Sequence, residues 1–299
     1  MSGSGEQFAS LPSGIDLCYE TFGNPDHPPV LLIMGLGGPM NWWSPTFCQK
    51  LSDRGFFVIR YDNRDTGRST KLRQHQVTKR DIVRTALRRD RAPYTIGDLA
   101  VDAVGLLDHL DVKRAHVVGV SMGGMIGQTL AIDHHERVLS LTSIMSTTGR
   151  RTVGRFHPKL IPLLLGSTGS TRDSYAKQAI RSAEALASPS YPPTREASLA
   201  RAHETYDRGW SASGTARHML AVLTQPDRTK RLSEVDLPVT VIHGKNDPLV
   251  HRSGGQATAR AIRGAEHVEI EGMGHDLPVE LYNTFIDAIA ETAARAAVD

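Results

Sequence analysis

Cysteine and long apolar runs are both scarce in this chain of 299 residues. Only two cysteines, Cys18 and Cys48, are present, which excludes a disulfide framework. No spacing of metal-ligating residues appears either, so we expect no metal site. The longest apolar runs, VLLIMG and LIPLLLG, are too short to span a bilayer. The start, MSGSGEQFAS, has no basic and apolar regions of a secretion signal, so we expect a cytoplasmic protein with its cysteines as buried free thiols.

A strong charge of either sign is also missing. The 35 Lys and Arg residues nearly balance the 32 Asp and Glu residues, and the formal net charge is +3. So small a charge, with no recognisable nucleic-acid motif, argues against a nucleic-acid partner. The 39% of hydrophobic residues is enough for the large core of a globular domain.

Short β-branched runs alternate with helical patterns along most of the chain. This alternation predicts an α/β fold with a mostly parallel sheet covered by helices on both faces. Each run predicts a strand buried on both faces. The predicted strands are Val30 to Met34, Phe56 to Tyr61, Ala115 to Val120, Leu139 to Met145, Pro238 to His243 and His267 to Ile270. The predicted helices between and after them are Pro45 to Asp53, Ile96 to Leu110, Met122 to Asp133 and Val279 to Ala296.

Two segments depart from this alternation. Gln7 to Phe22 alternates loosely across a Pro-Ser-Gly turn and predicts an antiparallel hairpin at the sheet edge. The second segment, 147–230, carries several helical stretches where one crossover helix would suffice. We therefore expect a core of residues 1–146 and 231–299, with residues 147–230 inserted as a helical cap over the carboxyl ends of the strands, where such sheets bind ligands.

The stretch HVVGVSMGGMIGQ places Ser121 between close glycines, after a predicted strand and before a predicted helix. Gly-x-Ser-x-Gly in that context is typical of a nucleophile elbow, a sharp turn that exposes the serine hydroxyl. An ordinary glycine-rich turn is the alternative on these residues alone.

A serine nucleophile needs a base and a group that orients the base. Asp247 follows the predicted strand at Pro238 to His243, and His275 follows the last one. Both residues therefore belong at the same edge of the sheet as Ser121. An imidazole with its ordinary pKa of about 6.5 suits proton transfer near neutral pH.

Five motifs occur in the order VLLIMGLGG, RYDNRDTGRS, GVSMGG, HGKNDPLV and GMGHDLP. Together they resemble the α/β-hydrolase superfamily across nearly the whole chain. RYDNRDTGRS, and Met-Gly in place of the usual His-Gly, are most similar to actinobacterial serine esterases, including mycobacterial lipase-like hydrolases and anthracycline methyl esterases.

The resemblance implies Ser121 as nucleophile, His275 as base and then acid, and Asp247 as the orienting carboxylate. It implies that the backbone N–H groups of Leu36 and Met122 form the oxyanion hole, and that no cofactor is needed. Met34 stands where the family commonly has a histidine, which leaves the backbone donor at Leu36 in place.

Several other residues have structural interpretations. Asp276 beside His275 is a weaker candidate for the acid than Asp247, because neighbouring side chains rarely point the same way. Asp62, Arg64 and Asp65 are expected to serve turns and internal ion pairs. His134 and His135 are expected on a solvated face, and Trp42 and Trp43 either line the pocket or pack in the core.

These observations predict a serine carboxylic-ester hydrolase that acts on a small-molecule ester through an acyl-enzyme. The alternatives are a carbon–carbon bond hydrolase or a serine perhydrolase of the same fold, and a hydrolase-like ligand receptor. A serine at the elbow argues against dehalogenases and epoxide hydrolases, whose elbow carries aspartate. Acyl chain length, alcohol group and oligomeric state are not encoded in any motif.

The stretch 71–91 is the most basic in the chain and predicts an amphipathic helix over Lys79 to Asp90. Such a helix packs on its own domain or contacts an anionic lipid surface. We expect this helix to pack on its own domain, with contact to an anionic lipid surface as the minor hypothesis.

Overall fold

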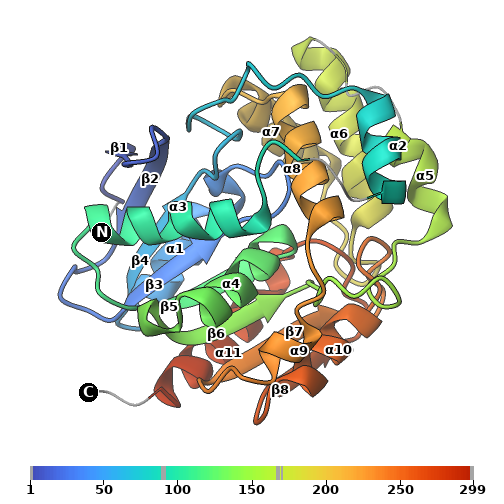
Figure 1. Ribbon diagram of the computed structural model, residues 1–299. Coiled ribbons are helices and arrows are strands. Elements are labelled where there is room, and N and C mark those ends of the chain that lie inside the picture. The colour runs from blue at the N-terminus through green and yellow to red at the C-terminus, as the bar shows by residue number, and fades with distance from the viewer. Residues whose placement is uncertain (1–2, 89–91, 166–168, 170, 297–299) are drawn as a thin grey trace.

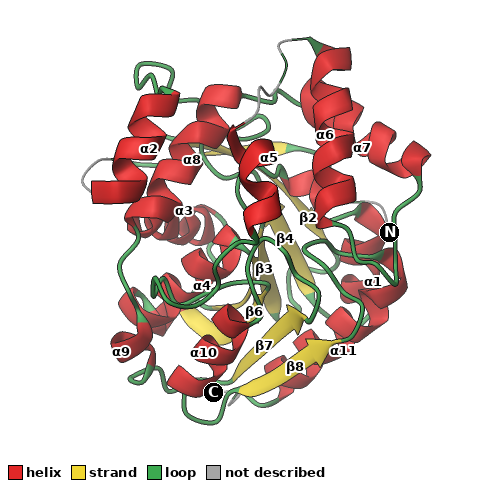
Figure 2. Cartoon of the chain, turned by 90° about the vertical axis from the view of Figure 1, so that its right-hand side faces the viewer, coloured by secondary structure: helices red, strands yellow, loops and turns green. Residues whose placement is uncertain are grey.

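The described part of the chain forms one eight-stranded sheet (Figures 1 and 2). A computed structural model describes residues 3–88, 92–165, 169 and 171–296. The strand order is β1-β2-β4-β3-β5-β6-β7-β8. Neighbouring strands from β4 to β8 run parallel, whereas β1 pairs with β2, and β2 with β4, in antiparallel register. The strands are β1 (Gln7–Ser10), β2 (Asp16–Phe22), β3 (Pro29–Ile33), β4 (Phe57–Tyr61), β5 (Ala115–Val120), β6 (Val138–Ile144), β7 (Val239–Gly244) and β8 (Glu266–Ile270).

The predicted α/β fold and the hairpin at the sheet edge are confirmed. One prediction about burial is wrong: β8 is not buried on both faces. Glu266 and His267 are exposed, and Val268 to Ile270 are only half-buried. The reason is that β8 ends the sheet and pairs with β7 alone, so its polar residues can reach solvent.

Helices cover both faces of the sheet. Side chains along β3 alternate between the two faces. Leu31 and Ile33 pack in a core with α3 (Ile96–His109) and α4 (Met122–Asp133), whereas Val30 and Leu32 pack in a second core with α1 (Pro45–Ser52) and α11 (Tyr282–Ala294). Cys18 and Cys48 are both buried and free. The structure also contains α10 (Ser253–Ala261) and the short 3₁₀ turns η1 (Met40–Trp42), η2 (His135–Arg137) and η4 (Val279–Leu281).

Between β6 and β7 the chain leaves the sheet and forms helices that gather at one end of it (Figure 1). They are η3 (Pro158–Leu160), α5 (Ile161–Leu165), α6 (Arg172–Leu186), α7 (Arg195–Asp207) and α8 (Ala212–Thr224). The last helix of the segment, α9 (Thr229–Leu232), lies apart from them and packs on α10 and α4 (Figure 2). Helices α6 and α7 pack on each other. Helix α8 approaches the core closely at Gly214, where a Cβ atom would lie 2.3 Å from the Asp65 carbonyl oxygen.

The basic stretch 71–91 contains helix α2 (Lys79–Arg88), which packs on α8. Arg89, Asp90 and Arg91 lie outside the described residues. Ile82 is half-buried, but Val83 and Leu87 are 50% and 74% exposed. The predicted apolar stripe is therefore divided between a packed part and a part that faces solvent.

Candidate active site

Ser121 lies at the sharp turn between β5 and α4. Its backbone has φ 56° and ψ −115°, a region that residues other than glycine rarely adopt. The Ser121 N–H donates to the Ile144 carbonyl at 2.8 Å, and its own carbonyl accepts from the Ser146 hydroxyl at 2.8 Å. These bonds from the neighbouring strand hold the strained turn in place.

Two glycines around Ser121 allow the backbones to come close. A Cβ atom at Gly119 would lie 2.2 Å from the Gly123 carbonyl oxygen, and one at Gly123 would lie 2.1 Å from the Ile33 carbonyl oxygen. Any larger residue at either position would push α4 away from β3 or β5.

His275 and Asp247 are brought next to Ser121 by the loops after β8 and β7. The His275 Nε2 atom lies 3.1 Å from the Ser121 hydroxyl oxygen, and its Nδ1 atom lies 2.7 Å from Asp247 Oδ2. Asp247 Oδ1 accepts from the backbone N–H groups of Leu249 and Val250 at 2.9 and 2.8 Å. The three side chains thus form one series of hydrogen bonds, and a turn fixes the carboxylate.

The Asp247 side chain is 0% exposed. Burial alone would raise its pKa, but the charge of His275 and the hydrogen bonds from His243 and His275 outweigh burial and lower the pKa to about 2. The carboxylate is therefore ionised at neutral pH, and as an acceptor it requires the proton of the imidazole at Nδ1.

Asp276, the neighbouring carboxylate, bonds to a different partner. Its Oδ1 atom accepts from the backbone N–H of Ser188 at 3.1 Å and from the Ser188 hydroxyl. That hydroxyl also accepts from the Gly274 N–H at 2.8 Å, and the Leu186 carbonyl accepts from the His275 N–H at 2.8 Å. Leu186 at the end of α6 and Ser188 just after it therefore hold the loop that carries His275.

Met122 follows Ser121 in the chain, and Gly35, the residue before Leu36, approaches Ser121 so closely that a Cβ atom on it would lie 3.2 Å from the Ser121 Cβ atom. Met122 is the first residue of α4, where a backbone N–H has no partner within its helix. In the turn after β3, the N–H of Gly38 donates to the Gly35 carbonyl and the N–H of Gly37 to His218. The N–H of Leu36 takes part in neither bond.

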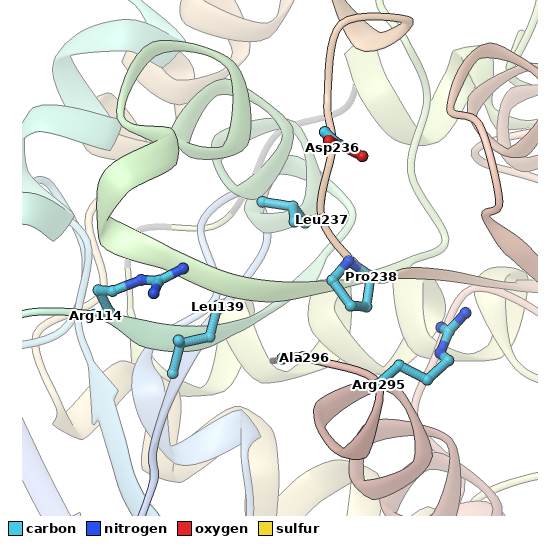
Figure 3. A pocket seen from close by; sticks show the side chains of 7 residues that line it. All are labelled: Arg114, Leu139, Asp236, Leu237, Pro238, Arg295 and Ala296. Atoms are coloured by element: carbon cyan, nitrogen blue, oxygen red, sulfur yellow. The ribbon is translucent and has the colours of Figure 1, made fainter. Parts of the chain in front are cut away.

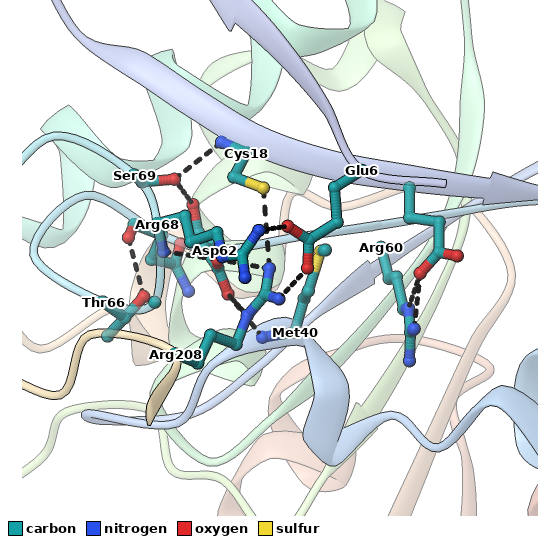
Figure 4. A network of polar contacts seen from close by, with 12 residues as sticks. Glu6, Cys18, Met40, Arg60, Asp62, Thr66, Arg68, Ser69 and Arg208 are labelled. Atoms are coloured by element: carbon teal, nitrogen blue, oxygen red, sulfur yellow. Dashed lines mark hydrogen bonds and ion pairs between the residues drawn. The ribbon is translucent and has the colours of Figure 1, made fainter. Parts of the chain in front are cut away.

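The loop after β4 carries three charged side chains in buried ion pairs. Asp62 pairs with Arg208 at 2.8 Å, and Arg208 also pairs with Glu6 (Figure 4). Asp65 makes two bonds to Arg217, at 2.6 and 2.7 Å. Arg64 pairs in the same way with Asp102 of α3, with both bonds at 2.6 Å. The loop therefore joins the core to the segment between β6 and β7.

Trp42 and Trp43 differ in burial and in their contacts. Trp43 is fully buried and packs on Phe47 in the core. Trp42 is half-buried, and its ring N–H donates to the Thr205 hydroxyl of α7 at 3.0 Å. Of the two histidines at the far end of α4, His135 has a side chain that is 79% exposed, in agreement with a solvated position, whereas His134 is half-buried.

An open pocket of about 400 Å³ lies at the amino ends of β5, β6 and β7 (Figure 3). Arg114, Leu139, Asp236 and Arg295 are among its lining residues. It is at the opposite edge of the sheet from Ser121. Within the described ranges, no three His, Cys, Asp or Glu side chains gather as a metal site would require. None of the helices in those ranges is long and apolar enough to cross a membrane.

A serine, a histidine and an aspartate in one hydrogen-bonded series at the carboxyl edge of a doubly covered parallel sheet are typical of the α/β-hydrolase class. The model of the family described as alpha/beta hydrolase fold matches residues 28–280. The chain belongs to this family, and it is an enzyme with hydrolase activity.

Two relatives match nearly the full length. The chain is 32% identical to a rhodomycin D methylesterase of Streptomyces peucetius, and 31% identical to one of Streptomyces sp. strain C5. Each match covers 95% of this chain and 97% of the relative. The crystal structure of the enol-lactonase from Burkholderia xenovorans LB400 superposes with a TM-score of 0.73 at 24% identity, covering 96% of this chain and 100% of that one.

Proposed function

We propose that the protein is a serine carboxylic-ester hydrolase in which Ser121 is the nucleophile, His275 the base and Asp247 the orienting carboxylate. The series of hydrogen bonds from the Ser121 hydroxyl through His275 to Asp247 carries this proposal. The family and the methylesterase relatives support ester hydrolysis as the reaction class.

The first half-reaction forms an acyl-enzyme. Because Asp247 is ionised, the neutral His275 ring has its proton on Nδ1, which leaves Nε2 free to accept the Ser121 proton. The Ser121 oxygen attacks the ester carbonyl, and the carbonyl oxygen becomes an oxyanion. The N–H groups of Leu36 and Met122 donate to it. His275 then protonates the alcohol oxygen as the bond to the acyl carbon breaks.

The second half-reaction repeats these roles with water as the nucleophile. His275 takes a proton from water, the hydroxyl attacks the acyl carbon, and a second oxyanion forms at the same site. The bond to Ser121 breaks, and His275 returns the proton to the serine oxygen. These steps release a carboxylic acid and need no cofactor.

Residues 147–230 act in this proposal as the cap, and residues 1–146 with 231–299 as the core. The hydrogen bonds that the His275 loop donates to Leu186 and Ser188 support this division, as does the bond between Trp42 and Thr205. The cap therefore borders the space beside Ser121 and selects the substrate.

Methyl esters are the first substrates to test, because both rhodomycin D methylesterases match almost the full chain. A series of p-nitrophenyl esters with increasing acyl length defines the acyl pocket independently. A diketone assay and a peroxide assay beside it test for carbon–carbon hydrolysis and perhydrolysis.

The decisive experiment combines Ser121→Ala with labelling by an organophosphate. The wild-type protein is expected to be labelled once per chain at Ser121, with loss of esterase activity. Ser121→Ala should lower kcat by about 10⁴-fold or more while its circular dichroism spectrum stays unchanged. Full activity in this variant would refute the role of Ser121. A wild-type protein that binds esters without turnover would indicate a ligand receptor.

A further inference from the structure

The turn that carries Leu36 is held by side chains from outside it. The Asn63 amide donates to the Met34 carbonyl at 3.2 Å, and Asp62 Oδ1 accepts from the Met40 N–H at 2.7 Å. Between these two bonds, the N–H of Gly37 donates to Nδ1 of His218 at 3.1 Å. His218 lies on α8, 181 positions away in the sequence.

His218 is completely buried, and both of its ring nitrogens are bonded. Nε2 lies 2.8 Å from the carbonyl oxygen of Arg64. A peptide N–H can only donate and a carbonyl can only accept, so Nδ1 carries no proton and Nε2 carries one. Burial lowers the pKa of His218 to about 4, which keeps the ring in this neutral form at ordinary pH.

The bond to Gly37 bears on the direction of the Leu36 N–H. The peptide group before Leu36 is fixed through the Gly35 carbonyl, which accepts from the Gly38 N–H at 3.1 Å. The peptide group after Leu36 is fixed through the Gly37 N–H and His218. With both adjoining peptide planes held, the Leu36 N–H has one direction.

Helix α8 itself is firmly placed at this point. Arg217, the residue before His218, is fully buried and bonds twice to Asp65 in the loop that also contains Arg64. Tyr94 lies edge-on to the His218 ring and donates to Asp65 at 2.9 Å. His218 therefore connects the buried group of Arg217, Asp65 and Tyr94 to the turn that carries Leu36.

We propose that His218 is a positioning residue, which holds the Leu36 N–H in the direction needed to stabilise the oxyanion. This inference rests on the proposed ester hydrolysis and deepens it. His218 touches no reacting atom. It acts only through the Gly37 peptide. The Leu36 N–H therefore has its direction in the free enzyme, before the substrate binds.

Two variants separate the two bonds of His218. In His218→Asn the side-chain oxygen replaces Nδ1, so the bond to Gly37 can be kept while the bond to Arg64 is lost. In His218→Gln the amide nitrogen replaces Nε2, so the bond to Arg64 can be kept while the bond to Gly37 is lost. The control is His116→Gln on β5, which removes another buried neutral histidine, bonded to Ser140 at 2.8 Å and remote from Ser121.

The readouts are kcat, KM, the melting temperature and the inhibition constant of a trifluoromethyl ketone, whose adduct with Ser121 carries an oxyanion. Removing an oxyanion donor outright costs about 10²–10³-fold in kcat, so a misdirected donor should cost about 10–100-fold. We expect this loss of kcat in His218→Gln, with KM little changed and the ketone bound more weakly by a similar factor. His218→Asn and the His116→Gln control should keep kcat within about threefold, even where the melting temperature falls.

The inference is overturned if His218→Gln keeps wild-type kcat and ketone affinity in an enzyme that Ser121→Ala inactivates. It is also overturned if His218→Asn and His218→Gln lose kcat equally and in step with melting temperature, since the histidine would then serve stability alone. Failure of the proposed function looks different, because the wild-type protein would then show no Ser121-dependent turnover at all.

Discussion

Arg217→Met is expected to destabilise the protein strongly, because it leaves the Asp65 carboxylate buried without its cation. Both side chains are 0% exposed, and the arginine makes two bonds to Asp65 and one to the His75 carbonyl at 2.8 Å. After the change, Asp65 keeps only the Leu72 N–H at 2.8 Å and the Tyr94 hydroxyl at 2.9 Å.

The magnitude follows from the burial of the pair. Removing one partner of a buried ion pair costs about 3–5 kcal/mol, because desolvation of the remaining charge is no longer offset. For a chain of this size each kcal/mol lowers the melting temperature by roughly 2 °C, so a fall of roughly 6–10 °C is expected. Asp65→Leu combined with Arg217→Met should recover most of it, since no unpaired charge remains.

The pH dependence gives a second test of the same pair. Burial would raise the pKa of Asp65, but the hydrogen bonds from Arg217, Leu72 and Tyr94 lower it overall. The wild-type pair therefore contributes stability above the unfolded pKa of about 3.9, and loses it as the pH falls below that value. Without Arg217 the folded carboxyl has a raised pKa and can take up a proton. The difference from wild type should therefore shrink as the pH is lowered from 7 towards 5.

Differential scanning calorimetry and urea unfolding measure these changes. The control is Arg172→Met, because Arg172 and Asp207 bond with the same two-point geometry, at 2.8 and 2.7 Å, but their side chains are 45% and 53% exposed. Solvent and salt screen such a pair, so its loss should hardly change the melting temperature. If Arg217→Met lowers the melting temperature no more than Arg172→Met, the reasoning from burial is wrong.

Three further outcomes are expected. Asp247→Asn should lower kcat by about 10⁴-fold because an amide favours the wrong tautomer of His275, whereas Asp276→Asn should keep most of the activity; the reverse order would move the acid to Asp276. Asp247, with a pKa of about 2, should stay ionised from pH 5 to 8, so Asp247→Asn should lower kcat by a similar factor at each pH in this range; a loss that disappears towards pH 5 would show that the carboxylate takes up a proton there. Lipid contact by α2 stays a prediction. Arg84→Gln with Leu87→Ser should weaken sedimentation with anionic vesicles and leave hydrolysis of short soluble esters unchanged. A wild-type protein that does not sediment with anionic vesicles at low salt would exclude lipid contact.

The core could be predicted from the sequence because its signals are local. β5 and α4 begin and end at the residues that the pattern predicts, since a β-branched run and a helical pattern meet at a glycine-rich turn. The exposure of β8 could not be predicted, because burial of a strand depends on whether a second strand pairs with it. The pattern of one strand does not contain that information.

The candidate site also has a part that the sequence predicts and a part that it does not. Ser121, Asp247 and His275 each follow a predicted strand, so topology alone brings them to one edge. The bond between His218 and Gly37 joins residues 181 positions apart, and that between Arg208 and Asp62 joins residues 146 apart. The only local signal was a pair of polar residues, Arg217 and His218, within an otherwise apolar stretch of helix, which does not reveal a partner.

These distant bonds limit how the segment between β6 and β7 can move. At one side of Ser121, Leu186 and Ser188 hold the His275 loop, and at the other His218 holds the turn of Leu36. A rigid opening of the whole segment would break these contacts and separate two buried ion pairs, which is costly. We therefore expect opening for substrate entry to be confined to parts without such anchors. The amino end of α6 qualifies, because the ion pair that joins it to α7, between Arg172 and Asp207, is exposed and separates at little cost.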